Sequence, residues 1–338
     1  MKNKFYIALF VAFVVLLVSC DPETDDPIIP NPNSSTHVYI AANDSRFIDS
    51  GPAVYWKDSV KYVLSSDLSG SLAKAIFVDN NNNIYVGGKE FDKPVYWKNG
   101  TVNVLSDSYG CVNGLYISNN NVYAVGYLGK NAVVWKNGVI DTLNREGIYV
   151  EHDVTATAIF VQGNDVYISG FAGAYRAAGK ALFWKNGLLT IISDNVAMAN
   201  DIFVSGNNVY IVGIDKYQTT NMTSHKAVIW TNGISQDLNI GGLTSDAYSI
   251  FIANDTTYVA CNGYFGSAYD GYFKGCLWKN GNSSVFNCLS IQDVFVLGSD
   301  VYMVGIDGDI DKYPVLFKNG VKKIITYANS YPTAIFVK

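Results

Sequence analysis

Short apolar segments recur along the chain from residue 37 to the end, and short polar turns separate them. One segment reads AIFV, a second VYIVG, and a third ends in Trp before Lys-Asn-Gly, as in "ALFWKNGLL" from Ala181. Runs of Val, Ile, Tyr and Phe bounded by Asn, Asp and Gly are typical of β-strands. Because we find no helical periodicity after the first 20 residues, the pattern predicts an all-β chain.

The segments repeat with a period that the tryptophans mark. They stand at Trp56, Trp97, Trp135, Trp184, Trp230 and Trp278, with Phe317 in the seventh place, and they are 38 to 49 residues apart. Each unit contains four segments, which we name a (AIFV), b (VYIVG), c (ending in Trp) and d (after Asn-Gly). Four strands in about 40–45 residues are typical of one propeller blade. We expect each indole on strand c to pack between blades, burying about 200 Å².

The two ends of the repeat complement each other. Segment a occurs seven times, at 75–78, 114–117, 158–161, 201–204, 249–252, 293–296 and 334–337. The first unit begins at His37 with segment b and lacks its own a, whereas the chain ends one residue after a seventh a. The sequence therefore predicts a seven-bladed β-propeller of four-stranded antiparallel blades over residues 37–338, which the C-terminal strand closes by joining the N-terminal blade.

The N-terminus has the pattern of an export signal. "MKNK" is followed by an apolar run from Phe5 to Val18, which is too short to span a bilayer and typical of a secretory signal. The run ends in "LVSC", which resembles the lipobox of bacterial lipoproteins. The resemblance implies that residues 1–19 are a lipoprotein signal peptide, removed before Cys20, and that Cys20 is lipidated and anchors the chain in a membrane. The alternative is an ordinary signal peptide with a chance cysteine.

Residues 20–36 are acidic and rich in proline, which predicts a flexible tether. The acidic cluster in 21–26 resembles the export signals of lipoproteins of Bacteroidota, although a solvated linker has the same composition. We therefore expect an outer-membrane lipoprotein at the cell surface, with the periplasmic face as the alternative. The repeat itself resembles the HAF-type extracellular repeats of bacteria, best in "ALFWKNGLLTII", and seven-bladed propeller lipoproteins of gut Bacteroidota. Segment a departs from the HAF pattern, and the likeness implies a fold and no activity.

Charge and cysteine content narrow the function classes. The formal net charge is −5, which gives no basic surface for nucleic acid. The chain has three histidines and no C-x-x-C pair, so we predict no metal site and no cofactor. Apart from Cys20, the cysteines are Cys111, Cys261, Cys276 and Cys288. We interpret these four as buried free thiols, with a Cys261–Cys276 disulfide between neighbouring strands as the alternative.

The antiparallel order places the b–c and d–a connections on one face and the short a–b and c–d turns on the other. The b–c connections vary in length, and variable loops on a rigid scaffold commonly bind ligands. The predicted ligand-binding residues of the b–c connections are Arg46, Tyr175, Arg176, Tyr217, Tyr264, Tyr269, Tyr272 and Tyr313. Exposed rings beside polar groups suit a glycan or a protein partner, and the alternative is that these rings only pack loops together.

A second set of polar residues stands two positions before the apolar core of each segment a. The set consists of Lys74, Asn113, Thr157, Asn200, Tyr248, Gln292 and Thr333. We expect these side chains to ring the mouth of the central channel, where they bind a small ligand or hold water that satisfies the strand backbone.

Catalytic candidates are few. Glu151, His152 and Asp153 form the densest titratable cluster, but neighbours on a strand point to opposite sides, so the sequence assigns no catalytic residue beyond weak candidates in Glu151 and His152. The sequence favours a cell-envelope binding module with a glycan or protein ligand on the b–c/d–a face. The alternatives are a propeller lyase or hydrolase near the channel mouth and a purely structural envelope protein.

Overall fold

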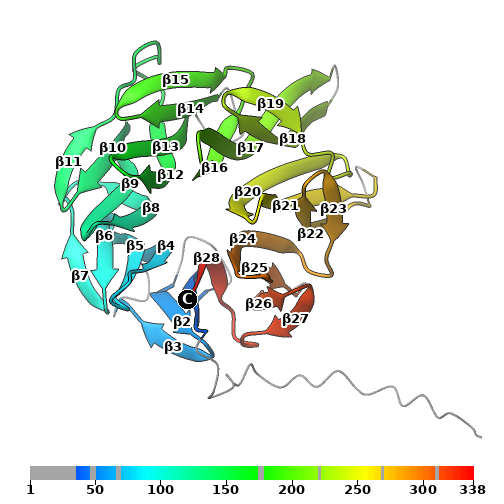
Figure 1. The fold of residues 1–338 in the computed structure, drawn as a ribbon, viewed down its shortest axis with the longest axis horizontal. Helices are drawn as coiled ribbons and strands as arrows, with labels where there is room; N and C mark the ends of the chain where they lie inside the picture. The colour runs from blue at the N-terminus through cyan, green and yellow to red at the C-terminus, as the bar shows by residue number, and fades with distance from the viewer. Residues whose placement is uncertain are drawn as a thin grey trace, which may run out of the picture.

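The fold is a ring of seven four-stranded antiparallel sheets around a central axis (Figure 1). The computed structural model describes residues 36–45, 51–65, 70–173, 179–219, 222–267, 270–308 and 312–338, apart from the side chains of 216–224. Within these ranges the chain forms 28 strands and no helix. The all-β, seven-bladed prediction is confirmed, and each sheet is one blade.

Strands a to d follow one another from the axis outward in every blade. The first four blades comprise β28 (Tyr331–Val337), β1 (Val38–Asn43), β2 (Ala53–Lys57) and β3 (Val60–Val63); β4 (Ser71–Val78), β5 (Ile84–Glu90), β6 (Lys93–Lys98) and β7 (Thr101–Val104); β8 (Gly110–Ser118), β9 (Asn121–Leu128), β10 (Asn131–Lys136) and β11 (Val139–Thr142); and β12 (Val154–Gln162), β13 (Asp165–Ala172), β14 (Lys180–Lys185) and β15 (Leu188–Ser193).

The remaining three blades include the two longest b–c hairpins of the ring, β17–β18 and β21–β22. These blades comprise β16 (Met198–Ser205), β17 (Asn208–Thr219), β18 (Met222–Thr231) and β19 (Ile234–Asp237); β20 (Thr244–Ala253), β21 (Thr256–Phe265), β22 (Tyr272–Lys279) and β23 (Asn282–Val285); and β24 (Ser290–Leu297), β25 (Asp300–Asp307), β26 (Tyr313–Lys318) and β27 (Val321–Ile324).

The ring is closed by its two ends. Strand β28 pairs antiparallel with β1, with Val337 opposite Val38 and Ile335 opposite Ile40, so the red C-terminal strand in Figure 1 completes the blue blade. The backbone N–H of Lys338 donates to the carbonyl of His37 at 2.9 Å, and the N–H of His37 donates back at 2.6 Å. The predicted closure is confirmed, and no innermost strand position is left empty.

The Asn-Gly pairs have two functions in the c–d turns. In a typical turn, Asn99 (φ 50°) and Gly100 (φ 83°) both have positive φ, as a type I′ hairpin turn requires. The Asn99 side-chain oxygen also accepts a hydrogen bond from the Ile84 N–H at 2.9 Å, at the start of strand b. The equivalent asparagines accept the same backbone hydrogen bond at Asn137, Asn186, Asn232, Asn280 and Asn319. The motif recurs because it shapes one turn and holds the neighbouring strand.

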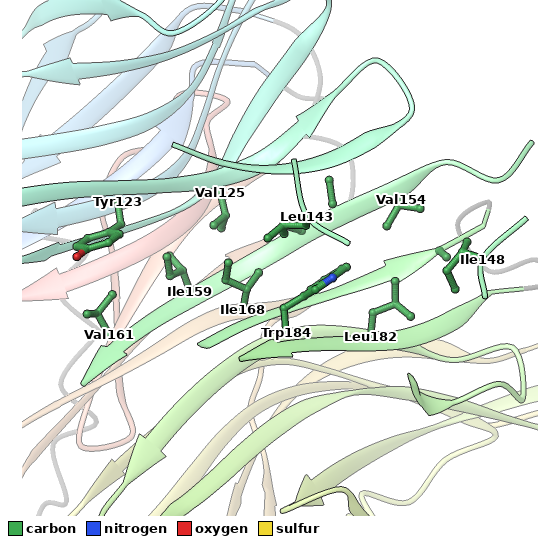
Figure 2. Packing of buried hydrophobic residues seen from close by; sticks show 13 residues of the cluster. Tyr123, Val125, Leu143, Ile148, Val154, Ile159, Val161, Ile168, Leu182 and Trp184 are labelled. Atoms are coloured by element: carbon green, nitrogen blue, oxygen red, sulfur yellow. The ribbon is translucent and has the colours of Figure 1, made fainter. Parts of the chain in front are cut away.

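The hydrophobic core lies between blades rather than in one central mass. Around Trp184, side chains from one blade (Val125, Leu143) pack against those of the next (Ile159, Ile168), as Figure 2 shows. Six more clusters of the same kind occupy the other interfaces between blades among the described residues. The indoles of Trp97, Trp135, Trp184 and Trp230 are 0–1% exposed, so the expected wedge position of the tryptophans is confirmed.

Candidate functional site: the axial channel

Every innermost strand has a β-bulge at the same place. In β4 the register shifts between Ala73 and Ala75, which leaves Lys74 unpaired with strand β5. The unpaired residues of the seven bulges are Lys74, Asn113, Thr157, Asn200, Tyr248, Gln292 and Thr333. A bulge re-aims one side chain without ending the sheet, and here it turns one polar side chain per blade toward the axis. We call these seven residues the mouth ring.

The mouth ring separates two cavities on the axis. A wide cavity of about 800 Å³, the vestibule, adds Lys89, Tyr109, Tyr127, Phe171 and Met198 to the ring as its wall. A deeper chamber of about 250 Å³ lies beyond the ring and is lined by the next residues of the innermost strands. All seven predicted mouth residues line both cavities, so the structure brings this set together around one space.

Mouth-ring side chains also join neighbouring blades. Asn113 Nδ2 donates to the Ala156 carbonyl at 2.9 Å, and Asn200 Nδ2 donates to the Ala247 carbonyl at 2.7 Å. Thr157 and Thr333 donate to the equivalent carbonyls, Ala199 O at 2.8 Å and Ala73 O at 3.0 Å. Each acceptor stands directly before the bulge of the next blade. Side chains thus satisfy backbone groups that we expected water to satisfy, and each bond contributes about 1 kcal/mol.

The deeper chamber is asymmetric. Where four blades place Ala or Gly after the mouth residue, three neighbouring blades place Asp201, Ser249 and Asp293. The Ser249 hydroxyl hydrogen-bonds both carboxylates. Asp201 also accepts the Ile250 N–H at 2.8 Å, and Asp293 accepts the Ile335 N–H of the closing strand at 2.7 Å. The arc therefore links three blades and the C-terminal strand.

The surroundings of this arc favour the neutral form of its carboxyl groups. Burial raises the pKa of Asp201 to about 6, against the opposing effect of its hydrogen bonds. Burial, with a contribution from the charge of Asp201, raises the pKa of Asp293 to about 7. A serine hydroxyl has one proton, so Ser249 can bond both carboxyl groups only when one of them is protonated. The arc thus holds a proton near neutral pH.

This proton makes stability depend on pH. The Asp293 pKa is raised above the ordinary value of about 4, so the folded chain holds a proton that the unfolded chain releases. The free energy of unfolding is then expected to fall as pH rises from about 4 to about 7. Asp293→Asn should flatten that decline by about 1 kcal/mol or more, because a tenfold change in proton affinity corresponds to about 1.4 kcal/mol.

Urea denaturation at several pH values measures this effect. Asp107→Asn is the matched control, since Asp107 is exposed and pairs only with Lys93 at 2.7 Å. If the free energy of unfolding of Asp293→Asn falls with pH as steeply as that of the unchanged protein, the Asp293 proton does not contribute to the pH dependence.

Seven aromatic rings encircle the axis beyond the chamber. Phe77, Tyr116, Phe160, Phe203, Phe251, Phe295 and Phe336 form an unbroken circle with neighbouring ring centroids 4.7–5.3 Å apart. Their interplanar angles are 48–55°, close to the rotation of about 51° that relates neighbouring blades in a sevenfold ring. The circle lies on the a–b side of the chamber, and the mouth ring that lines both cavities lies on the b–c/d–a side.

A buried group that the sequence did not reveal holds one member of the mouth ring. Tyr248 Oη donates to Asp246 Oδ2 at 3.1 Å, and His225 Nε2 lies 2.8 Å from the other oxygen of Asp246. His225 and Asp246 are both buried. His225 is in β18 and Asp246 in β20, and only the packing of two blades brings them together.

The structure describes the side chains of three of the eight predicted ligand-binding residues of the b–c connections, Tyr264, Tyr272 and Tyr313. Arg46, Tyr175, Arg176 and Tyr269, and the side chain of Tyr217, lie outside the described residues. Tyr217, Tyr264, Tyr272 and Tyr313 belong to strands and not to loops, because the hairpins extend further than the polar sequence indicated. None of the described side chains of this set lines the vestibule or the chamber.

The described rings of that set mainly pack against neighbours. Tyr264 and Phe273 have centroids 5.0 Å apart, and a Cβ on Gly271 would lie 2.2 Å from the Tyr264 ring. The Tyr313 and Tyr327 centroids are 5.8 Å apart. Tyr272 is 55% exposed. Tyr264 thus packs within its own hairpin, and Tyr313 packs against a d–a connection, so contacts inside the protein account for both rings, as in the alternative that these rings only pack loops together.

Glu151 and His152 lie in the turn that leads into β12, on a d–a connection, so the alternation expected of neighbours on a strand does not apply to them. Glu151 is exposed, and Arg145 Nη2 holds the turn by donating to the His152 carbonyl at 2.8 Å. Neither side chain lines the two axial cavities. Within the described residues, no group of three His, Cys, Asp or Glu side chains could hold a metal ion, and no helix is long and apolar enough to cross a membrane.

Cys261 and Cys276 face each other across β21 and β22, as the sequence indicated, yet both are free thiols. Cys111 and Cys288 are also free and buried. Burial raises the pKa of Cys276 and of Cys288 to about 12, so the thiolate is disfavoured at both. These cysteines are core residues, which is the first of the two interpretations from the sequence.

Comparison with known proteins supports the fold alone. No family model and no curated protein matches the chain. Among solved structures, the β-propeller domain of the trilobed protease from Pyrococcus furiosus, which has an open velcro topology, matches with a TM-score of 0.52 at 10% identity, over 88% of this chain and 96% of that one. The acylaminoacyl peptidase of Pyrococcus horikoshii matches with a TM-score of 0.52 at 11% identity, over 89% of this chain and 52% of that one. The likeness is one of fold. In this chain the ring is closed by β28.

Proposed function

We propose that the chain is a carbohydrate-binding module of the bacterial cell envelope, whose vestibule takes the end of a glycan. The observation that carries this proposal is the vestibule itself: a cavity of about 800 Å³ on the b–c/d–a face, with a polar mouth ring at its base. Its volume lies within the range of about 300–1,000 Å³ typical of small-ligand sites. A concave axial site fits a chain end better than it fits the flat surface of a folded protein.

The vestibule wall supplies the groups that sugars need. The Tyr109 ring is 57% exposed and rests against Tyr127, with centroids 5.7 Å apart. A flat ring of this kind can stack on the apolar face of a sugar. Lys89 Nζ is bound by Asp92 at 2.7 Å, which offsets its charge. The wall thus combines aromatic surface with groups that bind hydroxyls.

The cellular address of this module is also a proposal. We propose that the chain is lipidated on Cys20 after removal of residues 1–19, held in the outer membrane by the acyl chains, and exposed at the cell surface. Support comes from the lipobox and the acidic tether in the sequence. Mass spectrometry of the mature chain is expected to find an acylated N-terminal Cys20, and an unmodified cysteine there would refute the anchor.

Replacing Tyr109 should weaken glycan binding. Tyr109→Ala removes the stacking surface of the vestibule, and we expect about a tenfold loss of affinity, since a stacked ring contributes about 1.4 kcal/mol. A glycan array identifies the oligosaccharide that binds best, and calorimetric titration with it measures the affinities of the unchanged protein and the variant. Tyr149→Ala is the matched control, because Tyr149 is 67% exposed on another d–a connection and does not line the vestibule. Equal losses from both variants, or no bound glycan at all, would contradict the proposal.

A second candidate function is hydrolysis or elimination on the same glycan. The observation that favours it is the pair Asp201 and Asp293, whose pKa values of about 6 and about 7 suit proton transfer near neutral pH and which line the deeper chamber. Their bonds to Ile250 and Ile335 give them a structural role as well. Turnover that Asp201→Asn abolishes, with binding retained, would favour the enzyme.

A further inference from the structure

The hydroxyl groups of the mouth ring are oriented by the protein. Thr157 donates its proton to Ala199 O at 2.8 Å, and Thr333 donates to Ala73 O at 3.0 Å. Tyr248 donates to Asp246 Oδ2 at 3.1 Å. A hydroxyl has a single proton, so the Thr157 and Thr333 oxygens can offer only lone pairs to a molecule on the axis. One side of the Thr157 oxygen also faces Ser169 Oγ at 3.0 Å. Thr157, Thr333 and Tyr248 line both cavities.

The amide groups of the ring are anchored by their nitrogens. Asn113 and Asn200 donate from Nδ2 to wall carbonyls at 2.9 and 2.7 Å, and Gln292 Nε2 donates to Ser290 Oγ at 2.9 Å. Within the described residues no protein donor bonds their carbonyl oxygens, and each nitrogen keeps one further N–H. Lys74 and Tyr248 have further partners in the protein and are left out of this comparison. The other five residues of the ring present five oxygen acceptors, each with two lone pairs, and three amide N–H groups, so acceptor sites predominate.

The layer beneath the ring strengthens this preference. Asp201 and Asp293 line the chamber directly below, and among the described residues their hydroxyl partner is Ser249, which has one proton to share between them. With one shared proton the pair already carries one negative charge, and it gains a second when that proton is released at higher pH. An anionic ligand entering the chamber would meet this charge at short range, where repulsion is strong. Lys74 is the one cation of the ring.

We infer that the mouth ring selects a sugar end that donates hydrogen bonds, a neutral or amine-bearing one, and rejects anionic sugars such as uronates or sulfated units. This inference rests on the proposed function, since it specifies the ligand of the same vestibule. Hydroxyls and ammonium groups supply the donors that these acceptors need, whereas a carboxylate group supplies none at the position where it replaces a hydroxyl. His225 contributes indirectly as a positioning residue, because it holds the Asp246 that fixes Tyr248.

Three matched oligosaccharides test the selectivity: β1,4-linked oligomers of glucose, of glucosamine and of glucuronic acid, titrated against the propeller at pH 7 and constant ionic strength. We expect the glucose or glucosamine oligomer to bind at least about tenfold more tightly than the glucuronic acid oligomer. The Asp201→Asn, Asp293→Asn double variant should narrow that gap, whereas Asp107→Asn, which removes an exposed charge away from the channel, should leave it unchanged.

The outcomes separate the two proposals. Glucuronic acid oligomers that bind as tightly as the neutral ones would overturn the selectivity while leaving glycan binding intact. A gap that the double variant does not change would show that the carboxylates do not contribute to it. Should neither these oligomers nor any array glycan bind, both the selectivity and the proposed function would be wrong. Circular dichroism of each variant establishes that the propeller is folded.

Discussion

A chain that ends at residue 330 is expected to lose its cooperative folding transition. The missing segment is β28, the innermost strand of the first blade. Ile335 and Val337 are 4% and 2% exposed, and burying such a side chain contributes about 1.5–3 kcal/mol. Truncation also opens the aromatic circle at Phe336 and removes the N–H that Asp293 binds. These losses are comparable with the about 5–15 kcal/mol that stabilises a typical domain.

Thermal unfolding monitored by tryptophan fluorescence and circular dichroism tests this expectation. A synthetic peptide of residues 331–338, added in excess, should restore part of the transition, because it can pair with β1 in the native register. Phe336→Leu serves as a milder variant, since it keeps the strand and removes one ring from the circle. A truncated chain that unfolds at the temperature of the full one would show that closure contributes nothing.

Trp184→Ala should destabilise the propeller by about 3–5 kcal/mol, the range typical of large-to-small changes in a packed core. Trp184 is 0% exposed and fills the interface between two blades, where Figure 2 shows it beside Ile168 and below Leu143. Neighbouring blades cannot collapse into the space, because each is fixed by its own hydrogen bonds. Urea denaturation of the folded variant measures the loss.

Comparing two phenylalanine variants isolates the contribution of the indole N–H. Trp184 Nε1 donates to the Asn144 carbonyl at 2.7 Å, whereas the N–H of Trp97 is buried with no protein acceptor among the described residues. Trp184→Phe therefore breaks a bond, and Trp97→Phe removes an unpaired donor. We expect Trp184→Phe to lower the free energy of unfolding by about 1 kcal/mol more than Trp97→Phe does. Equal costs, or a larger one at Trp97, would show that this bond does not stabilise the interface. Phe317, fully buried in the seventh place, indicates that the position needs no N–H.

The blade order, the turns and the closure could be predicted from the sequence because each rests on local chemistry. The pair Asn99-Gly100 is typical of a type I′ turn, and the last AIFV segment supplies the strand that the first blade lacks. The bulges could not be predicted, since an extra unpaired residue has no marker of its own. The sequence did place polar residues such as Asn113 and Thr333 near the axis, because they interrupt an apolar strand at a constant position.

Contacts between residues of different blades could not be predicted from the sequence. Nothing near His225 indicates that it will meet Asp246, since they come from different blades. The replacement of Ala and Gly by Asp201, Ser249 and Asp293 is visible in an alignment of the seven units, but its meaning depends on knowing that the position faces the chamber. The lengths of β17 and β21 were underestimated because polar residues at the ends of long hairpins look like loops.

The junction between His37 and Lys338 also determines on which side of the ring the tether joins. Both residues lie at the a–b end of the first blade, and Thr333, at the other end of β28, belongs to the mouth ring. The tether therefore joins the disc on the side opposite to the opening. If the proposed acyl group holds residue 20 at a bilayer, the point of attachment lies on the a–b side of the propeller, and the b–c/d–a face with the vestibule is left unobstructed by it.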